Sequence, residues 1–156
     1  MSYLSKGKEI EKEFAKNLSN VIFATQEQDI IEHWDIEADY NNTRKKFDVK
    51  SIKKQNRYDD LSSEIFHWVE LSNVLGGKRT GSLYGKTDYF VYEIEDYWII
   101  VDKIILQKFI EEKCKGKKIE KNKDPYTLFR REGRKDIVVK VKTIDLFYIA
   151  TEIIKK

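Results

Sequence analysis

The sequence predicts a mixed α/β fold in which helices pack on a mixed sheet, organised as one domain over residues 1–156. Amphipathic helical spacing near the N-terminus, strand-like alternation through the middle, and a further helix–strand–helix succession after residue 102 support this prediction. Such a mixed order of helices and strands is typical of a sheet flanked by helices. A chain of 156 residues, 40% of them hydrophobic, is long enough to bury a core.

Residues 8–18 are expected to form a helix, because Ile10, Phe14 and Leu18 fall on one face of it. Residues 25–32 are expected to form a short second helix with Thr25 as its N-cap. Strands follow at 33–40 and 46–52.

The polar segment 41–43 predicts a hairpin turn between these two strands. In the second strand, period-two alternation puts Phe47 and Val49 on one face and Asp48 and Lys50 on the other. Because Phe47 and Val49 need a core, this strand is expected to be central in the sheet.

The rest of the chain continues the alternation of elements, with a basic loop of four glycines at 76–86. Asp102 and Thr143 are expected to cap helices, and the lysine-rich segment 115–123 is expected to be a loop. The predicted elements are strands at 66–74, 88–94 and 97–101, a helix from 102 to 114, strands at 126–130 and 137–141, and a helix through 154.

Composition limits the class of protein. Cys114 is the only cysteine, so no internal disulfide can form, which favours a reducing compartment. No apolar run is long enough to span a membrane and the N-terminus lacks a signal-peptide pattern, so we expect a cytoplasmic protein without membrane contact. Residues 113–156 carry 14 Lys and Arg against 6 Asp and Glu, whereas residues 1–112 carry 16 against 21. This asymmetry fits a carboxylate site beside a polyanion-binding surface, or simply an uneven solvated surface.

The residues with the clearest chemistry are Asp35, Asp48 and Lys50. Asp48 and Lys50 share a strand face, and Asp35 starts the neighbouring strand of the hairpin, so the three side chains are expected to converge. Two carboxylates offer the oxygen ligands that a hard divalent cation prefers, and such a cation activates water for attack on a phosphate. An Asp-x-Lys pair also occurs on solvated strand faces, where the charges pair weakly.

This pattern resembles the PD-(D/E)XK nuclease superfamily, which includes restriction endonucleases and archaeal-type Holliday junction resolvases. In that superfamily an acid begins one strand and (D/E)-x-K lies on the next, positions that Asp35, Asp48 and Lys50 match. Trp34 stands where the family has proline. The resemblance covers roughly residues 6–54. The later part is more similar to small phage or mobile-element proteins of the same superfamily.

The segment 6–14 resembles the Lys-Gly-x-x-x-Glu-Arg-Glu-Leu opening of the junction resolvases. On that match Glu11 is the acid of the first helix, with Glu13 and then Glu9 as alternatives. Glu70 is either a further ligand or lysine-orienting group, or a plain surface acid.

The resemblance implies a restriction-endonuclease-like mixed sheet flanked by helices and an Mg²⁺- or Mn²⁺-dependent endodeoxyribonuclease. Asp35, Asp48 and the Val49 carbonyl would bind the metal, Lys50 would position the nucleophile, and Glu11 would support the metal or its waters. DNA is the expected substrate, with branched DNA and RNA as alternatives. A homodimer is one expected arrangement, because cutting both strands often takes two sites.

The histidines and the basic clusters are candidates of a second kind. His33 is a candidate general base, although a structural role in a loop is favoured, and His67 is expected to serve packing or lie on the surface. Phosphate contacts are expected from arginine and lysine side chains in the glycine-rich loop and in the turn after residue 129. These residues are Arg79, Lys86, Arg130, Arg131 and Arg134.

Two other classes of function compete with a nuclease. A non-catalytic nucleic-acid-binding module with the same fold would bind DNA without metal-dependent cutting. A structural or interaction protein would carry the carboxylates and lysine merely as a sheet surface, and would bind no metal specifically.

Overall fold

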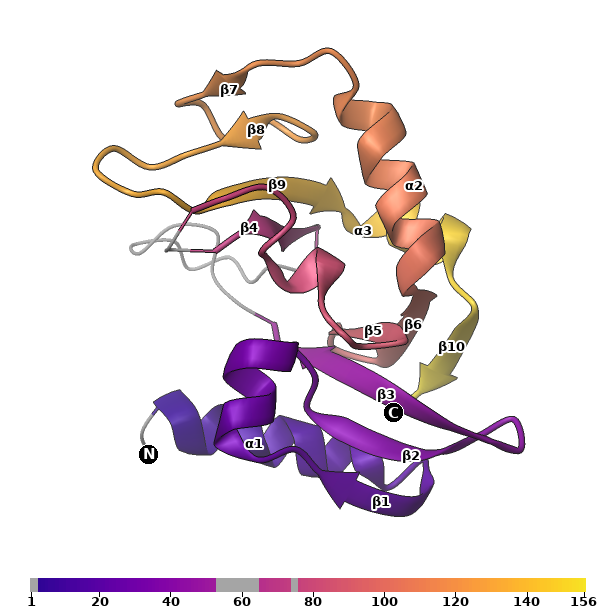
Figure 1. Ribbon diagram of the computed structural model, residues 1–156. Coiled ribbons are helices and arrows are strands. Elements are labelled where there is room, and N and C mark those ends of the chain that lie inside the picture. The colour runs from indigo at the N-terminus through magenta and orange to yellow at the C-terminus, as the bar shows by residue number, and fades with distance from the viewer. Residues whose placement is uncertain (1–2, 53–64, 74–75) are drawn as a thin grey trace.

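The computed structural model describes residues 3–52, 65–73 and 76–156. Across these ranges the fold is mixed α/β, with two mixed sheets and a few helices, so the predicted α/β class is confirmed (Figure 1). The expectation of a single sheet is wrong. Alternation along a strand predicts which face is buried, but it does not select the partner strand, and the strand that begins at Phe66 pairs with a late segment of the chain.

The larger sheet has six strands in the spatial order β1-β2-β3-β5-β6-β10. Its strands are β1 (Ser19–Phe23), β2 (Ile36–Tyr40), β3 (Thr43–Lys50), β5 (Tyr89–Glu93), β6 (Tyr97–Asp102) and β10 (Glu152–Lys155). All neighbours are antiparallel except β3 and β5. A parallel pair cannot be joined by a tight turn, so the chain leaves the sheet after Lys50 and returns at Tyr89. The expected central position of β3 is confirmed.

The β2–β3 hairpin turns where the sequence predicted it. Tyr40 pairs with Thr43, so only Asn41 and Asn42 form the turn, and both have positive φ, 50° and 67°. Two consecutive left-handed residues match the twist of the flanking strands, and asparagine tolerates this conformation better than most residues. This turn fixes the register that brings the ends of β2 and β3 together.

The smaller sheet has four strands in the order β4-β9-β8-β7. Its strands are β4 (Phe66–Ser72), β7 (Ile119–Glu120), β8 (Leu128–Phe129) and β9 (Ile137–Lys142). β7 lies inside the segment expected to be a loop, which is a correction. A two-residue strand is too short for alternation to reveal. Residue 74, the end of the strand expected at 66–74, lies outside the described residues.

Helices accompany both sheets: α1 (Tyr3–Ala15), the π-helical turn η1 (Gln28–Glu32), the 3₁₀ turn η2 (Ser82–Tyr84), α2 (Lys103–Cys114) and α3 (Thr143–Ile149).

Two expected caps are confirmed. Asp102 Oδ1 accepts hydrogen bonds from the N–H groups of Ile104 (2.8 Å) and Ile105 (3.1 Å). Thr25 and Gln28 form a reciprocal capping box. No helix in the described part of the chain is long and apolar enough to cross a membrane.

The C-terminal prediction is wrong in two respects. The last helix ends at Ile149, and the residues expected to prolong it form β10, which closes the open edge of β6 through four residue pairs. Thr143 is the first residue of the helix and not its cap, and its Oγ1 is buried without a hydrogen-bond partner among the described residues. Its N–H continues the contact with β4 by donating to Ile65 O at 2.8 Å.

The first helix and the strand after it also differ from the prediction. α1 ends at Ala15 and not at residue 18, and β1 occupies Ser19–Phe23, where no strand was expected. β1 is an edge strand with mostly exposed side chains, so it lacks the alternation that marks a half-buried strand.

Helix α1 lies on one face of the larger sheet and the smaller sheet lies on the other (Figure 1). The buried side chains accordingly form two cores, one on each face. The α1-side core contains Phe14, Ile36, Ala38, Phe47, Val91, Trp98 and Ile100. The inter-sheet core contains Val69, Phe90, Tyr92, Ile99, Val101, Leu106, Ile110, Val139, Val141 and Leu146. Phe47 and Val49 pack on the α1 side, as alternation predicted, so Asp48 and Lys50 face the side of the second sheet.

Candidate catalytic site

Asp35 is held in place from three directions. It precedes β2, and its N–H donates to Phe47 O at 2.8 Å while its carbonyl accepts from Ala24 N at 2.8 Å. Its carboxyl Oδ2 accepts from the Val49 N–H at 2.7 Å. With a residue exposure of only 7%, Asp35 is a buried acid fixed on the backbone of the neighbouring strand.

Asp48 and Lys50 are neighbours on one face of β3, as the alternation predicted. Lys50 Nζ lies 3.0 Å from Asp48 Oδ1. Asp48 is 5% exposed, whereas about a third (31%) of the Lys50 side chain reaches solvent. Because Ile36 pairs with Phe47, the residues just outside this pair, Asp35 and Asp48, lie at the same end of the hairpin. The structure therefore brings together the three residues singled out from the sequence.

Of the three acids on the first helix, Glu11 is the one that meets Asp35. Its half-buried side chain is hydrogen-bonded to the Asp35 carboxyl. Glu9 is exposed, and Glu13 is an exposed partner of Lys16 at 2.9 Å. Helix α1 thus adds a third carboxyl group to the pair that the hairpin supplies.

The crowding of these acids raises their affinity for protons. Burial, together with the charges of Asp48 and Glu11, raises the pKa of Asp35 to about 10. Burial, with Asp29 and Asp48 nearby, raises the pKa of Glu11 to about 7. A hydrogen bond between two carboxyl groups needs one proton, so the Asp35–Glu11 pair holds one. A cation bound at this point would take over the role of that proton.

The same surroundings favour the charged form of Lys50. Burial by itself would lower its pKa, but the charge of Asp48, joined by that of Asp35 once it ionises, outweighs burial and raises the pKa above the ordinary lysine value. Glu70, on β4, contributes to the same effect from the second sheet. Lys50 therefore remains an ammonium group at neutral pH.

Asp29 joins the site, although no role was expected for it from the sequence. It lies on η1, and its charge helps to raise the pKa of Glu11. Together with Glu11 and Asp35 it lines a cavity of about 400 Å³, which also includes Lys8 and Ile30. The available signal was an acid on the short predicted helix before Asp35. The cavity offers space directly beside the carboxyl cluster.

The remaining candidates occupy supporting positions. Glu70 Oε1 accepts from Ser82 N at 3.3 Å, which ties it to the glycine-rich loop. His33 adopts a left-handed conformation (φ 60°) at the end of η1 and packs closely against Gly85. His67 is buried, with its ring 5.0 Å from that of Tyr92, so the expected packing role is confirmed.

The basic residues expected to contact nucleic acid are distributed over three places. Arg79 and Arg130 line one cavity beside β4. Lys86 lies near η1, 3.9 Å from Glu32. Arg131 and Arg134 belong to the exposed turn between β8 and β9, where Arg131 is 4.0 Å from Asp136. The structure thus gathers only Arg79 and Arg130 directly.

The donor set fits a hard divalent cation by its chemistry. In the described ranges, no three acidic, histidine or cysteine side chains are gathered so as to hold a metal by themselves. Mg²⁺ commonly uses one or two carboxylates and completes its shell with water and phosphate. Asp35 and Asp48 supply two carboxylates. The Val49 carbonyl leaves β3 on the same side as the N–H that Asp35 binds, because both groups of a strand residue point the same way.

Comparison with known proteins identified no relative of this chain. No family model, no curated protein and no solved structure matches the chain.

Proposed function

We propose that the protein is a divalent-cation-dependent nuclease of the PD-(D/E)XK type, which hydrolyses phosphodiester bonds in DNA. One observation carries the proposal: Asp35 and Asp48 are buried at one end of a central hairpin, with Lys50 Nζ 3.0 Å from Asp48 and Glu11 hydrogen-bonded to Asp35. Burying carboxyl groups that repel one another is costly, and such arrangements are concentrated at functional sites.

Each residue has a distinct task in this mechanism. Asp35, Asp48 and the Val49 carbonyl would hold Mg²⁺ or Mn²⁺, and the resemblance supplies this assignment. When bound, the ion lowers the pKa of a coordinated water and offsets charge on the phosphate. Glu11 is hydrogen-bonded to Asp35 in the cation-free protein, and its carboxylate can accept a hydrogen bond from a water in the adjoining cavity.

Lys50 acts as a cation and not as a base. Its ammonium group has no lone pair to accept a proton at neutral pH, since neighbouring carboxylates raise its pKa. It can therefore donate hydrogen bonds that orient the attacking water and stabilise negative charge on the phosphate oxygens. The solvent-exposed third of its side chain leaves access for a phosphate.

DNA as substrate and a homodimer as working unit both follow from the resemblance. Exposed Arg79, Lys86, Arg131 and Arg134 supply the positive side chains that contact a phosphate backbone. RNA is the alternative substrate, since both nucleic acids present the same phosphodiester to the site.

A non-catalytic nucleic-acid-binding module is the competing function. It is favoured by the absence, within the described ranges, of three ready-gathered metal ligands. Such a module would bind DNA equally in EDTA and in Mg²⁺, and replacing Asp35 by alanine would leave binding intact or make it tighter.

The decisive experiment is cleavage of labelled linear, single-stranded, flapped and four-way-junction DNA, and of RNA, in Mg²⁺, Mn²⁺ or EDTA. Asp48→Asn and Lys50→Met preserve size and should each lower the cleavage rate by at least about a hundredfold. Asp96→Asn and Lys108→Met, at exposed positions, are the matched controls and should cut normally. Binding without metal-dependent cutting of any substrate would replace the nuclease by the binding module.

A further inference from the structure

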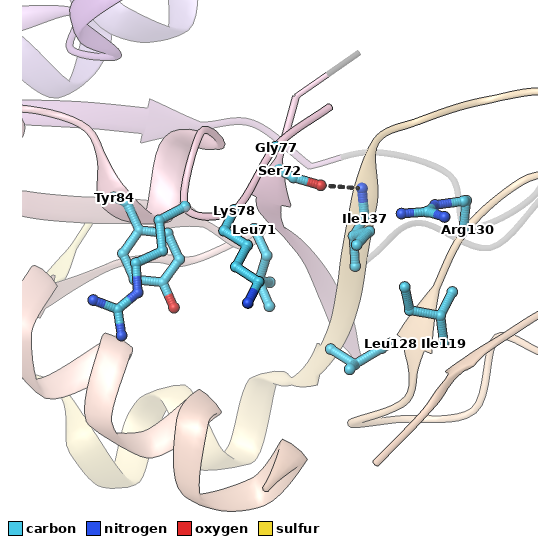
Figure 2. A pocket seen from close by; sticks show the side chains of 10 residues that line it. Leu71, Ser72, Gly77, Lys78, Tyr84, Ile119, Leu128, Arg130 and Ile137 are labelled. Carbon is cyan, nitrogen blue, oxygen red and sulfur yellow. Dashed lines mark hydrogen bonds between the residues drawn. The ribbon is translucent and has the colours of Figure 1, made fainter. Parts of the chain in front are cut away.

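A second cavity, separate from the carboxyl cluster, opens between the glycine-rich loop and the strands of the smaller sheet (Figure 2). Its volume is about 450 Å³, within the range of pockets that bind small molecules. In Figure 2 Tyr84 and Arg130 lie toward opposite ends of the cavity, with Leu71 and Ile137 between them. The cavity is therefore an apolar slot with an aromatic ring toward one end and a guanidinium group toward the other.

Positive charge is concentrated at the rim of this slot, where Lys78, Arg79 and Arg130 all contribute to the lining. Among the residues that the structure describes, no acidic side chain lines the cavity. An apolar interior with cationic side chains at its rim suits a ligand that combines a flat apolar part with an anionic group. Arg79 and Arg130 were expected from the sequence as phosphate contacts, but their meeting at one place was not expected.

The Arg130 side chain is incompletely satisfied. It is half-buried, and its Nε is buried with no hydrogen-bond partner among the described residues. A buried N–H on a charged group is costly unless an acceptor is supplied. The Ser72 hydroxyl, which also lines the cavity, accepts a hydrogen bond from Ile137 N at 3.0 Å. An acceptor from a ligand would satisfy Arg130.

The opposite end is held ready for a planar group. The Tyr84 hydroxyl donates to Glu111 Oε1 at 2.9 Å, which fixes the orientation of the ring. The Arg79 guanidinium lies 5.4 Å from the centre of the same ring and 3.9 Å from Glu111. Aromatic and guanidinium groups arranged in this way are the usual stacking platforms for nucleobases.

We propose that this cavity binds one unpaired nucleotide of the nucleic-acid substrate, with its base in the apolar slot and its phosphate at Arg130 and Lys78. The inference rests on the proposed function and narrows its substrate to nucleic acid that contains an unpaired nucleotide. The location supports it, because Leu71 lines the slot while the preceding residue, Glu70, interacts electrostatically with Lys50. The slot and the Lys50 ammonium group therefore both lie near β4.

Binding can be tested without cleavage by fluorescence anisotropy of labelled oligo(dT) in EDTA, with unlabelled competitors. Thymidine 5′-monophosphate should compete better than thymidine or inorganic phosphate, since only the nucleotide fills both ends of the slot. Oligo(dT) should bind more tightly than a duplex of equal length. An acidic peptide with apolar side chains that outcompetes the nucleotide would overturn the assignment.

Two substitutions should each weaken oligo(dT) binding by about tenfold, the usual effect of losing one stacked base or charged contact. Arg130→Gln removes the cation, and Ile119→Trp fills the slot from a strand position that is 44% exposed. Lys155→Gln and Ile105→Trp are the matched controls, the latter at 45% exposure on α2. Thermal melting confirms that each variant is folded.

The outcomes separate this inference from the proposed nuclease. Metal-dependent cutting of duplex or junction DNA, combined with equal weakening by target and control variants, would overturn the nucleotide slot and leave the nuclease standing. Tight oligo(dT) binding that depends on Arg130 and persists in Asp48→Asn, without any cutting, would support the slot and overturn the nuclease.

Discussion

At the scale of single residues, the carboxyl cluster opposes the stability of the fold. Asp35 has a pKa of about 10 in the folded protein, far above the ordinary aspartate value of 3.8. As pH rises above 3.8 the unfolded chain releases this proton, whereas the folded chain retains it until about pH 10. The cluster therefore destabilises the cation-free protein increasingly as pH rises through this window.

Asp35→Asn should consequently stabilise the cation-free protein by about 1–2 kcal/mol at neutral pH, because the amide keeps the Val49 hydrogen bond and carries no charge. Thermal melting in EDTA measures the effect. Asp96→Asn, at an exposed turn, should change little. Added Mg²⁺ should raise the melting temperature of the wild type and not that of Asp35→Asn. A lower melting temperature for Asp35→Asn in EDTA would contradict the repulsion argument.

His67 predicts a loss of stability in the acid range. Burial lowers its pKa to about 4, so the folded protein keeps this histidine neutral while the unfolded chain protonates it below about pH 6.5. Stability is therefore lost as pH falls from 6.5 toward 4. Between about pH 7 and pH 5 the wild type should lose about 2 kcal/mol more than His67→Phe, which can still pack on Tyr92.

Urea unfolding at several pH values measures the difference in slope. Parallel stability curves for the wild type and His67→Phe would show that His67 contributes nothing to acid sensitivity.

At the scale of elements, the sequence was sufficient to predict the features that depend only on residues close together in the chain, such as helix caps and a tight turn. Asp102 and Thr25 cap as their residue types predict, and the two asparagines turn the hairpin. β10 and the pairing of β4 with β9 were not predictable in this way, because a strand's partner lies far along the chain. Ile153 and Ile154 suit a helix or a strand, and only the open edge of β6 decides between them.

Because the glycine-rich loop lies very close to β4, we expect that even a small side chain at Gly81 destabilises the fold. A Cβ added there would lie 2.4 Å from Glu70 O, and backbone cannot move aside as a flexible side chain can. Gly81→Ala should therefore destabilise the protein by about 1–3 kcal/mol and disturb the Ser82–Glu70 hydrogen bond.

Gly7→Ala is the matched control, because nothing lies within 4 Å of a Cβ at that position in α1. It should be neutral or stabilise the helix by about 0.5–1 kcal/mol. Chemical denaturation of both variants measures the two values, and similar destabilisation in both would argue against the close approach at Gly81.

At the scale of the whole molecule, some parts of the candidate site could be predicted to meet from the sequence, and other parts could not. Asp48 and Lys50 share a strand, and one turn connects them to Asp35, so their meeting was predictable from periodicity. Asp29 and the second cavity were not, because they depend on how η1 and the smaller sheet pack against the hairpin. Residues 53–64, which follow β3, lie outside the described residues.

The inter-sheet core predicts that the two sheets unfold together. Phe90 and Val101 of the larger sheet share this core with Val69 and Val139 of the smaller one, so neither sheet can bury that face alone. In a variant whose only tryptophan is Trp98, fluorescence reports on the larger sheet, and in a variant whose only tryptophan is Trp68 it reports on the smaller sheet. Far-UV circular dichroism reports on both sheets in either variant. Within each variant the two urea transitions should coincide. A Trp68 transition that precedes the loss of circular dichroism would show that the smaller sheet unfolds independently, and the expectation of one domain over residues 1–156 would then fail.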